Sequence, residues 1–281
     1  MATTSAPTRR AVKEFLRHIL PLPVRQALAA RLGRRGTWPG RYWWCMDLLR
    51  DWADRDPDAF HRFLWRHHLG YAETYEVEQR FGPDRVHPSR NLLFVDLAAW
   101  LEAAGRPPSQ VRSVFEVGCS LGHLLRHLET HLFEFAPVLE GVDIDARAVE
   151  RGREHLSRLG SKVRIRVGDM ADLERHFSLP GYDVILCAGV LMYLTQAEAE
   201  RVVRTIIRHT GTVAVFAGLA HPEADNASLE GSTERQRDGT WIHNIDAMVS
   251  RAGGVVAWRR WEGPRAVEGN TIYFVLATPG T

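Results

Sequence analysis

The stretch VFEVGCSLGHLLRHLE, residues 114–129, decides how the rest of the chain is interpreted. It starts with a short β-rich apolar run, passes through a turn with Gly118 and Gly122, and continues with leucines at helical spacing. Glycine lets a backbone turn tightly and approach a ligand, and a helix start offers free amides to polar or anionic groups. The stretch therefore predicts a strand, a ligand-binding loop and a helix. Ser120 stands where a third glycine is common, so the loop alone does not identify its ligand.

Strand-like and helix-like segments alternate after residue 110. The strand-like runs are VRSVFEVG, LEGVDID, KVRIRVGD, YDVILCAG and TVAVFAGLA, and amphipathic segments such as TQAEAERVVRTIIRHT lie between them. This alternation predicts βαβ units and a doubly wound, mostly parallel α/β sheet with helices on both faces. VVAWRRWEG and NTIYFVLATP follow one another without a helix between them. They predict an antiparallel pair at the edge of the sheet.

The N-terminal third of the chain has a different pattern. Residues 1–10 are small, polar or basic and are predicted to be disordered. Residues 11–108 show helical periodicity broken by proline and glycine, which predicts a helical cap on the substrate side. Residues 109–281 are predicted to form the α/β domain.

Composition excludes several classes of protein. The 281 residues include 36 basic and 34 acidic side chains, so no overall field favours nucleic acid or an anionic membrane. The three cysteines form no C-x-x-C pair, which fits a reducing cytoplasm and argues against a zinc site or a disulfide framework. The N-terminal stretch is too polar for a signal peptide, and the longest apolar run is too short to span a bilayer. We expect a soluble, cytoplasmic protein.

The ends of the other predicted strands carry polar groups as well. In doubly wound sheets a ligand binds outside the carboxyl ends of the strands, where the strand order reverses. Asp143, at the end of GVDID, could accept both hydroxyls of a ribose. Asp169 and Met170, in GDM, could meet an exocyclic amine and a flat ring. Cys187, in CAG, ends a strand whose following glycine leaves room for a ligand.

Together these motifs resemble one family. Residues 111–220, about two fifths of the chain, look like the cofactor half of a class I (Rossmann-like) S-adenosylmethionine-dependent methyltransferase. That family has an acidic residue followed by G-x-G-x-G, here E-V-G-C-S-L-G, and acidic residues after its second and third strands. The resemblance implies a seven-stranded sheet with an antiparallel C-terminal edge strand, and S-adenosyl-L-methionine as cofactor.

The resemblance also implies roles for individual residues. It assigns the loop after the first strand to the methionine end, Asp143 to the ribose, and Asp169 with Met170 to adenine. Glu116 would fix the loop or meet the amino group of the cofactor. The full set implied to bind the cofactor is Glu116, Gly118, Cys119, Ser120, Gly122, Asp143, Ile144, Asp169, Met170 and Cys187, with Tyr75 reaching from the helical cap.

A nicotinamide-binding Rossmann domain is the rival interpretation, because Asp143 lies 21 residues after Gly122. That fingerprint requires G-x-G-x-x-G, whereas this loop reads G-C-S-L-G. Glu116, the GDM sequence and the antiparallel C-terminal pair are unexplained in a dehydrogenase. The methyltransferase interpretation is therefore favoured.

Three residues are candidates for catalysis. His221 and His243 lie in polar loops and could act as general bases, although capping a helix or bonding a backbone carbonyl is the commoner role of such a residue. Tyr71 shares a helical face with Tyr75 and could lie near the sulfonium, or simply pack in a helix interface. His123, His127 and His131 also repeat at helical spacing, but no ligand set is completed beside them. We expect no metal.

The acceptor is inferred by elimination. No N-P-P-Y-like sequence follows the fourth strand, and no RNA-binding module is visible. We therefore expect a small-molecule acceptor, as in specialised metabolism, with oxygen slightly favoured because of the two loop histidines, and no nucleic acid or membrane as partner. Methylation on nitrogen or carbon, and a partner protein that binds the cofactor without catalysis, remain alternatives. A homodimer stays open.

Overall fold

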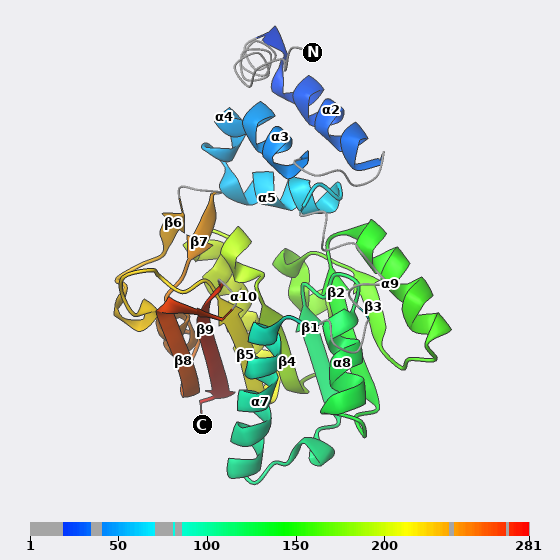
Figure 1. Cartoon of the computed structure of the whole chain (residues 1–281), viewed down its shortest axis with the longest axis vertical. Coiled ribbons are helices and arrows are strands. Elements are labelled where there is room, and N and C mark those ends of the chain that lie inside the picture. The colour runs from blue at the N-terminus through cyan, green and yellow to red at the C-terminus, as the bar shows by residue number, and fades with distance from the viewer. Residues whose placement is uncertain are drawn as a thin grey trace, which may run out of the picture. The chain divides into compact units, whose positions relative to one another are not determined.

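The computed structural model describes residues 19–34, 41–70, 81, 86–235, 239–267 and 270–280 (Figure 1). The chain divides into two compact units, Met1–Tyr75 and Glu76–Thr281. None of the helices in the described ranges is both long and apolar enough to cross a membrane.

The first unit is helical where it is described. Its helices are α2 (Leu22–Arg34), α3 (Arg41–Leu48), α4 (Arg50–Ala53) and α5 (Pro57–Arg66). Asp56 caps α5, because its carboxylate accepts a hydrogen bond from the Ala59 N–H at 3.1 Å. The core of this unit is a cluster of aliphatic and aromatic side chains that includes Leu48, Leu49, Phe60 and Leu64. The helical pattern expected for this region is present in the described residues.

The second unit contains a seven-stranded sheet in the order β3-β2-β1-β4-β5-β9-β8 (Figure 1). The strands are β1 (Ser113–Val117), β2 (Val138–Asp143), β3 (Arg164–Val167), β4 (Tyr182–Ala188), β5 (Thr210–Gly218), β8 (Gly254–Val267) and β9 (Asn270–Pro279). The first five pair in parallel, whereas β9 is antiparallel to both β5 and β8. The order reverses between β1 and β4, which puts the expected ligand site at their carboxyl ends. The predicted fold class is confirmed.

Helices cover both faces of this sheet. One face packs against α7 (Pro88–Ala103), α8 (His123–His131) and α9 (Ala146–Arg158), which Figure 1 labels. The other face packs against α10 (Gln196–His209), α11 (Ile245–Arg251) and η3 (Met170–His176). Side chains along β1 alternate, so Val114 and Phe115 belong to the cores on opposite faces. Asp145 caps α9 through hydrogen bonds from the N–H groups of Arg147 and Ala148.

Helix α7 belongs to the sheet unit, although the sequence pattern suggested a division between residues 108 and 109. Its side chains Leu93, Phe94, Leu97 and Leu101 are buried in the same core as β1 and α8. An amphipathic helix packs its apolar stripe against a hydrophobic surface, and the sequence alone does not show which surface that is. The compact unit accordingly begins at Glu76.

Short elements lie in the connections of this unit. The turn η2 (Pro108–Gln110) comes just before β1. The others follow β4 and β5 and are η4 (Leu191–Tyr193), η5 (Asn226–Ser228) and a small hairpin of β6 (Thr233–Arg235) and β7 (Thr240–Ile242). The element η4 directly follows the carboxyl end of β4, and β7 packs beside it.

Candidate functional site

The loop between β1 and α8 holds three residues in the left-handed backbone region. Their φ angles are +74° at Gly118, +48° at Ser120 and +76° at Gly122. The Gly118 N–H also donates to the carbonyl oxygen of Val142 at 2.8 Å, which ties the loop to β2. A Cβ atom at Gly118 would lie only 2.4 Å from Val190 Cγ2, so this position requires glycine.

Ser120 adopts a conformation that glycine reaches at lower cost. Its N–H donates to Asp143 Oδ2 at 2.7 Å. Its Oγ is buried and has no hydrogen-bond partner among the described residues. Since a buried polar atom without a partner costs about 1–3 kcal/mol, this hydroxyl is a candidate to contact a bound ligand.

Asp143 lies at the carboxyl end of β2 and fixes the loop from there. One carboxylate oxygen accepts from the Ser120 N–H, and the other accepts from the Asp145 N–H at 2.8 Å. Burial raises the pKa of Asp143 to about 6, against the lowering effect of these backbone hydrogen bonds. Each carboxylate oxygen has a second lone pair, so both can still accept hydroxyl groups.

Glu116 projects from β1 and is only 2% exposed. Its Oε2 atom has no hydrogen-bond partner in the described part of the chain. Burial, reinforced by the nearby charge of Asp143, raises the pKa of Glu116 to about 8, and the guanidinium of Arg90 acts in the opposite direction. A carboxyl group in this state gains most from a ligand that brings a positive charge.

Arg90 is a candidate site residue that the sequence alone did not reveal. It lies in the first turn of α7, on the same face as the buried residues Leu93, Phe94 and Leu97. A Cβ atom at Gly189 would lie 2.8 Å from Arg90 Nη2, so the guanidinium reaches the end of β4. Burial lowers the pKa of Arg90, while the neighbouring Glu116 and Cys187 raise it. An arginine that continues an apolar helical stripe is the signal in the sequence that could have identified it.

Arg90 and Glu116 therefore place a guanidinium group and a carboxyl group that a bound cation would ionise at neighbouring positions of the strand-end site. Such a pair suits a ligand group that is itself a zwitterion, such as the amino and carboxylate groups of a free amino acid. The hydrogen bond from the Ser120 N–H to Asp143 connects the loop after β1 to the end of β2.

Two of the predicted site residues are core cysteines. Cys119 and Cys187 are each at most 1% exposed, and burial raises the pKa of the Cys187 thiol to about 12. The pKa of Cys119 is also raised by burial. Both side chains are therefore neutral, and only their backbone atoms are suited to polar contact with a ligand.

The remaining predicted cofactor residues lie at the ends of β2 and β3. Asp169 caps η3 by accepting from the Ala171 N–H at 3.0 Å, and it is half-buried. Met170 is half-buried against the core on the α10 side. The Gly168 N–H donates to the Asp143 carbonyl oxygen at 2.9 Å, which couples the two strand ends. Ile144 is half-buried directly after Asp143.

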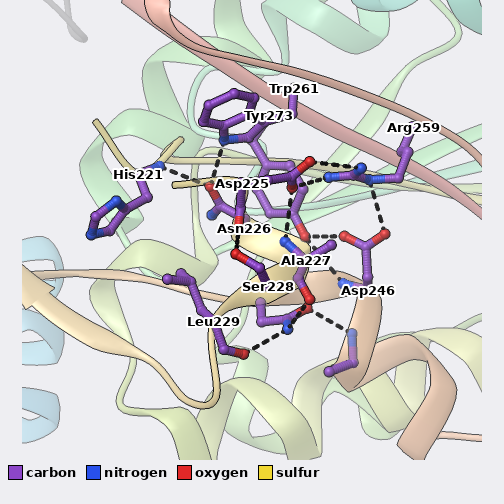
Figure 2. A network of polar contacts seen from close by, with 12 residues as sticks. His221, Asp225, Asn226, Ala227, Ser228, Leu229, Asp246, Arg259, Trp261 and Tyr273 are labelled. Atoms are coloured by element: carbon purple, nitrogen blue, oxygen red, sulfur yellow. Dashed lines mark hydrogen bonds and ion pairs between the residues drawn. The ribbon is translucent and has the colours of Figure 1, made fainter. Parts of the chain in front are cut away.

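His221 is engaged in local hydrogen bonds. Its Nδ1 accepts from the N–H groups of Glu223 at 3.2 Å and Ala224 at 3.1 Å. Its backbone N–H donates to the side chain of Asn226, at the centre of the network in Figure 2. Because Nδ1 accepts, the ring proton of the neutral imidazole lies on Nε2. This arrangement favours the capping alternative over the general base.

His243 is 3% exposed and bonds through both ring nitrogens. Its Nδ1 lies 2.7 Å from Ser232 Oγ, and its Nε2 lies 2.9 Å from the carbonyl oxygen of Leu191. Tyr71 and Tyr75, the other candidates from the sequence, lie outside the described residues.

The histidines of α8 contact aromatic rings. His127 stacks on Phe94 with ring centroids 5.5 Å apart, and His131 lies beside His127. Within the ranges that the structure describes, no group of three or more His, Cys, Asp or Glu side chains could hold a metal ion.

Comparisons with known proteins connect this geometry to a family. A family model described as a methyltransferase domain matches residues 115–212, the segment that contains Glu116, Asp143 and Asp169. The carboxy-S-adenosyl-L-methionine synthase of Wolinella succinogenes is 31% identical over 109 residues, which cover 38% of this chain. The chain spans 44% of the length of that curated relative.

Solved structures share the fold. The magnesium protoporphyrin IX methyltransferase of Synechocystis PCC 6803, solved with bound SAM, is 16% identical with a TM-score of 0.56 and covers 78% of this chain and 97% of its own. A SAM-dependent methyltransferase of Leishmania major is 14% identical with a TM-score of 0.55 and covers 80% and 85%. Arg90, His221, Ser232 and His243 lie outside the segment that the family model matches.

Proposed function

We propose that this chain, which contains a class I S-adenosylmethionine-dependent methyltransferase domain, methylates a small-molecule acceptor. One observation supports this most strongly. At the carboxyl ends of β1 and β2, the buried atoms Glu116 Oε2 and Ser120 Oγ lack partners among the described residues, and Asp143 has lone pairs left to accept hydroxyls. A ligand with amino, carboxylate and ribose groups supplies a partner for each.

The residues of this site fit S-adenosyl-L-methionine, the cofactor of the domain. When bound, its sulfonium supplies an electrophilic methyl group. Glu116 would hold the amino group, Arg90 the carboxylate and Asp143 the ribose hydroxyls. Gly118 and Gly122 give the loop its left-handed turns, and Asp169 with Met170 would hold adenine.

Transfer of a methyl group from a sulfonium is an in-line displacement, so the protein must mainly align the acceptor and remove its proton. We favour oxygen slightly over nitrogen or carbon, because the Ser232 hydroxyl bonded to His243 can take a proton from an acceptor hydroxyl. His221 and Tyr71 stay predictions as bases, as does Tyr75 as a cofactor contact. A small-molecule acceptor, specialised metabolism, a homodimer and a cytoplasmic location also stay predictions.

The direct test incubates the protein with S-adenosyl-L-methionine and a panel of hydroxyl-, amine- and carbon-acid metabolites, and measures S-adenosylhomocysteine and methylated product by mass spectrometry. Product from a hydroxyl compound supports the proposal in full. Product only from amines or carbon acids corrects the acceptor atom. Cofactor binding without any product across the panel favours a non-catalytic partner protein and contradicts the proposal.

Arg90→Gln tests the cofactor-holding side of the proposal. We expect its affinity for S-adenosylhomocysteine to fall at least about tenfold, because a charge-assisted hydrogen bond to a carboxylate contributes about 1.5–3 kcal/mol. Arg106→Gln, an exposed position in the same unit, is the matched control and should bind normally. Equal affinity of both variants by calorimetry would remove Arg90 from the site.

A further inference from the structure

We propose that Ser232 and His243 form a proton relay, in which Ser232 contacts the acceptor hydroxyl and His243 acts through Ser232. The inference rests on the proposed function and names the group that activates the acceptor. In this relay Ser232 is the catalytic residue, and His243 is a positioning residue that receives the proton from it.

The hydrogen bonds around His243 fix the direction of the relay. The carbonyl oxygen of Leu191 can only accept, so the bond at 2.9 Å requires a proton on His243 Nε2. In the neutral ring Nδ1 then carries a lone pair, and Ser232 Oγ–H donates to it at 2.7 Å. Ser232, His243 and the Leu191 carbonyl oxygen are therefore arranged as a hydroxyl, its base and the group that orients the base.

The backbone around the pair is held from two sides. The side-chain Nδ2 of Asn226 donates to the carbonyl oxygen of His243 at 2.8 Å. The N–H of Ser232 donates to Gln196 Oε1 at 2.9 Å, at the start of α10. A base whose orientation is fixed in this way loses little entropy when it takes a proton.

Burial assigns the two residues their roles. His243 is 3% exposed, so its ring cannot itself meet an acceptor. Ser232 is half-buried, so it is the more exposed residue of the pair. A general base at this site must therefore act through the serine.

The pair also lies beside the loop that would hold the cofactor. Leu191, whose carbonyl oxygen orients His243, directly follows Val190 in the chain. Val190 in turn packs against Gly118, since a Cβ there would lie 2.4 Å from Val190 Cγ2. A chain of direct contacts thus connects the loop after β1 to Ser232 and His243 at the carboxyl end of β4.

The proposed step balances in atoms and charge. The O–H bond of the acceptor breaks and its proton passes to Ser232 Oγ, while the Ser232 hydroxyl proton passes to His243 Nδ1. The acceptor oxygen forms a bond to the methyl carbon, and the carbon–sulfur bond breaks with its electron pair left on sulfur. His243 leaves the step as an imidazolium, hydrogen-bonded to the Leu191 carbonyl oxygen, and later releases the proton to water.

The activated hydroxyl can be tested without knowing the acceptor, with diisopropyl fluorophosphate as the probe. Ser232 Oγ would form a bond to phosphorus, fluoride would leave, and the serine proton would pass to His243. We expect Ser232 to be labelled at least tenfold faster than Ser228, an exposed serine in the same segment whose Oγ donates to the Asp225 carbonyl oxygen. His243→Gln should lower the labelling rate at Ser232 about 100-fold, the low end of general base catalysis.

An NMR measurement distinguishes loss of the relay from loss of structure in a variant. In ¹⁵N spectra of the wild-type protein His243 should show a protonated Nε2 and an accepting Nδ1, and Ser232→Ala should shift the Nδ1 resonance. Ser232→Thr, which keeps the hydroxyl, should restore it. Absent labelling at Ser232, equal labelling in His243→Gln, or an unchanged Nδ1 resonance in Ser232→Ala would each overturn the relay. Calorimetry with S-adenosylhomocysteine tests the proposed function separately from the relay. If the protein binds S-adenosylhomocysteine normally but Ser232 is not labelled, the relay is refuted and the cofactor site is not.

Discussion

The loop after β1, residues 118–122, and the segment of residues 219–246 differ in how their buried polar groups are satisfied. In the first region Ser120 Oγ and the adjoining Glu116 Oε2 have no partner among the described residues. In the second, Asn226 is fully buried and uses its whole hydrogen-bonding capacity. Its Nδ2 donates to the carbonyl oxygens of Leu219 and His243. Its Oδ1 accepts from the His221 N–H and from Trp261 Nε1 (Figure 2). Unsatisfied buried groups indicate where a ligand completes the structure, and satisfied ones indicate the support that holds catalytic groups in place.

The support region is extended by an ion-pair network. Arg259 on β8 pairs with both Asp225 and Asp246, and the Tyr273 hydroxyl donates to Asp246 (Figure 2). These contacts tie η5 and α11 to the edge of the sheet. The comparison therefore predicts that substitutions in the second region act mainly on stability, and substitutions in the first mainly on cofactor affinity.

The largest effect is expected for Asn226→Ala. The change leaves several buried groups without a partner, each costing about 1–3 kcal/mol, so we expect the free energy of unfolding to fall by about 4 kcal/mol in urea titrations. Asn91→Ala, at an exposed position on α7, should change it by less than about 0.5 kcal/mol. A loss below about 1 kcal/mol for Asn226→Ala would show that the network is not structural support.

Asp143→Ala tests the first region. We expect the dissociation constant for S-adenosylhomocysteine to rise about 100-fold, which corresponds to about 2.7 kcal/mol, because the ribose hydroxyls lose their acceptor and Ser120 loses its anchor. Asp143→Asn keeps one acceptor oxygen, so its dissociation constant should lie between those of the wild type and Asp143→Ala. Asp172→Ala, exposed on η3, is the control. Affinity within threefold of wild type in Asp143→Ala would refute the ribose role.

The buried carboxyl of Glu116 predicts a pH dependence of the ligand-free protein. With its pKa raised to about 8 by burial, it keeps a proton in the folded state that the unfolded chain has released above about pH 4.5. The folded state then binds more protons, so the free energy of unfolding should fall as the pH rises from about 5 to 8. Since one pKa unit corresponds to about 1.4 kcal/mol, we expect a fall of about 2 kcal/mol over the two pH units from 6 to 8.

Glu116→Gln isolates this contribution. The pKa of Asp143, raised to about 6, adds a fall of the same sign in both proteins, so the difference between their curves belongs to Glu116. We expect the variant to show the smaller slope in chemical denaturation at several pH values. If the free energy of unfolding depends on pH in the same way in both proteins, Glu116 is ionised in the free protein and needs no cationic ligand to ionise it.

The smallest effect is expected for Ser120→Gly. Loss of the unpartnered hydroxyl should weaken S-adenosylhomocysteine binding about threefold, or about 0.7 kcal/mol. Stability should stay the same or rise slightly, because glycine adopts the left-handed φ at lower cost. If affinity is unchanged while stability rises, Ser120 is only a substitute for a glycine and not a ligand group.

The same contrast explains how much the sequence could predict. Gly118, Asp143 and Asp169 lie at or just after the carboxyl end of a strand, and a parallel sheet brings these ends to one edge, so local patterns were sufficient to predict their position at that edge. Arg90 lies on a helix before the first strand, and only the packing of α7 brings it to the end of β4.

The pairing of Ser232 with His243 could not be predicted from the sequence either. It depends on a hairpin and on the Leu191 carbonyl oxygen, contacts that leave no periodic pattern. For His221, the residue type suggested a base, whereas the hydrogen bonds from Glu223 and Ala224 favour a cap. Residue type alone does not say where a ring nitrogen is directed.

Calorimetry tests most directly whether S-adenosyl-L-methionine is the cofactor that completes the first region. S-adenosylhomocysteine titrated into the wild-type protein should bind one equivalent, and NAD⁺ or NADP⁺ at the same concentration should neither bind nor compete. Absence of S-adenosylhomocysteine binding together with binding of a nicotinamide nucleotide would contradict the account.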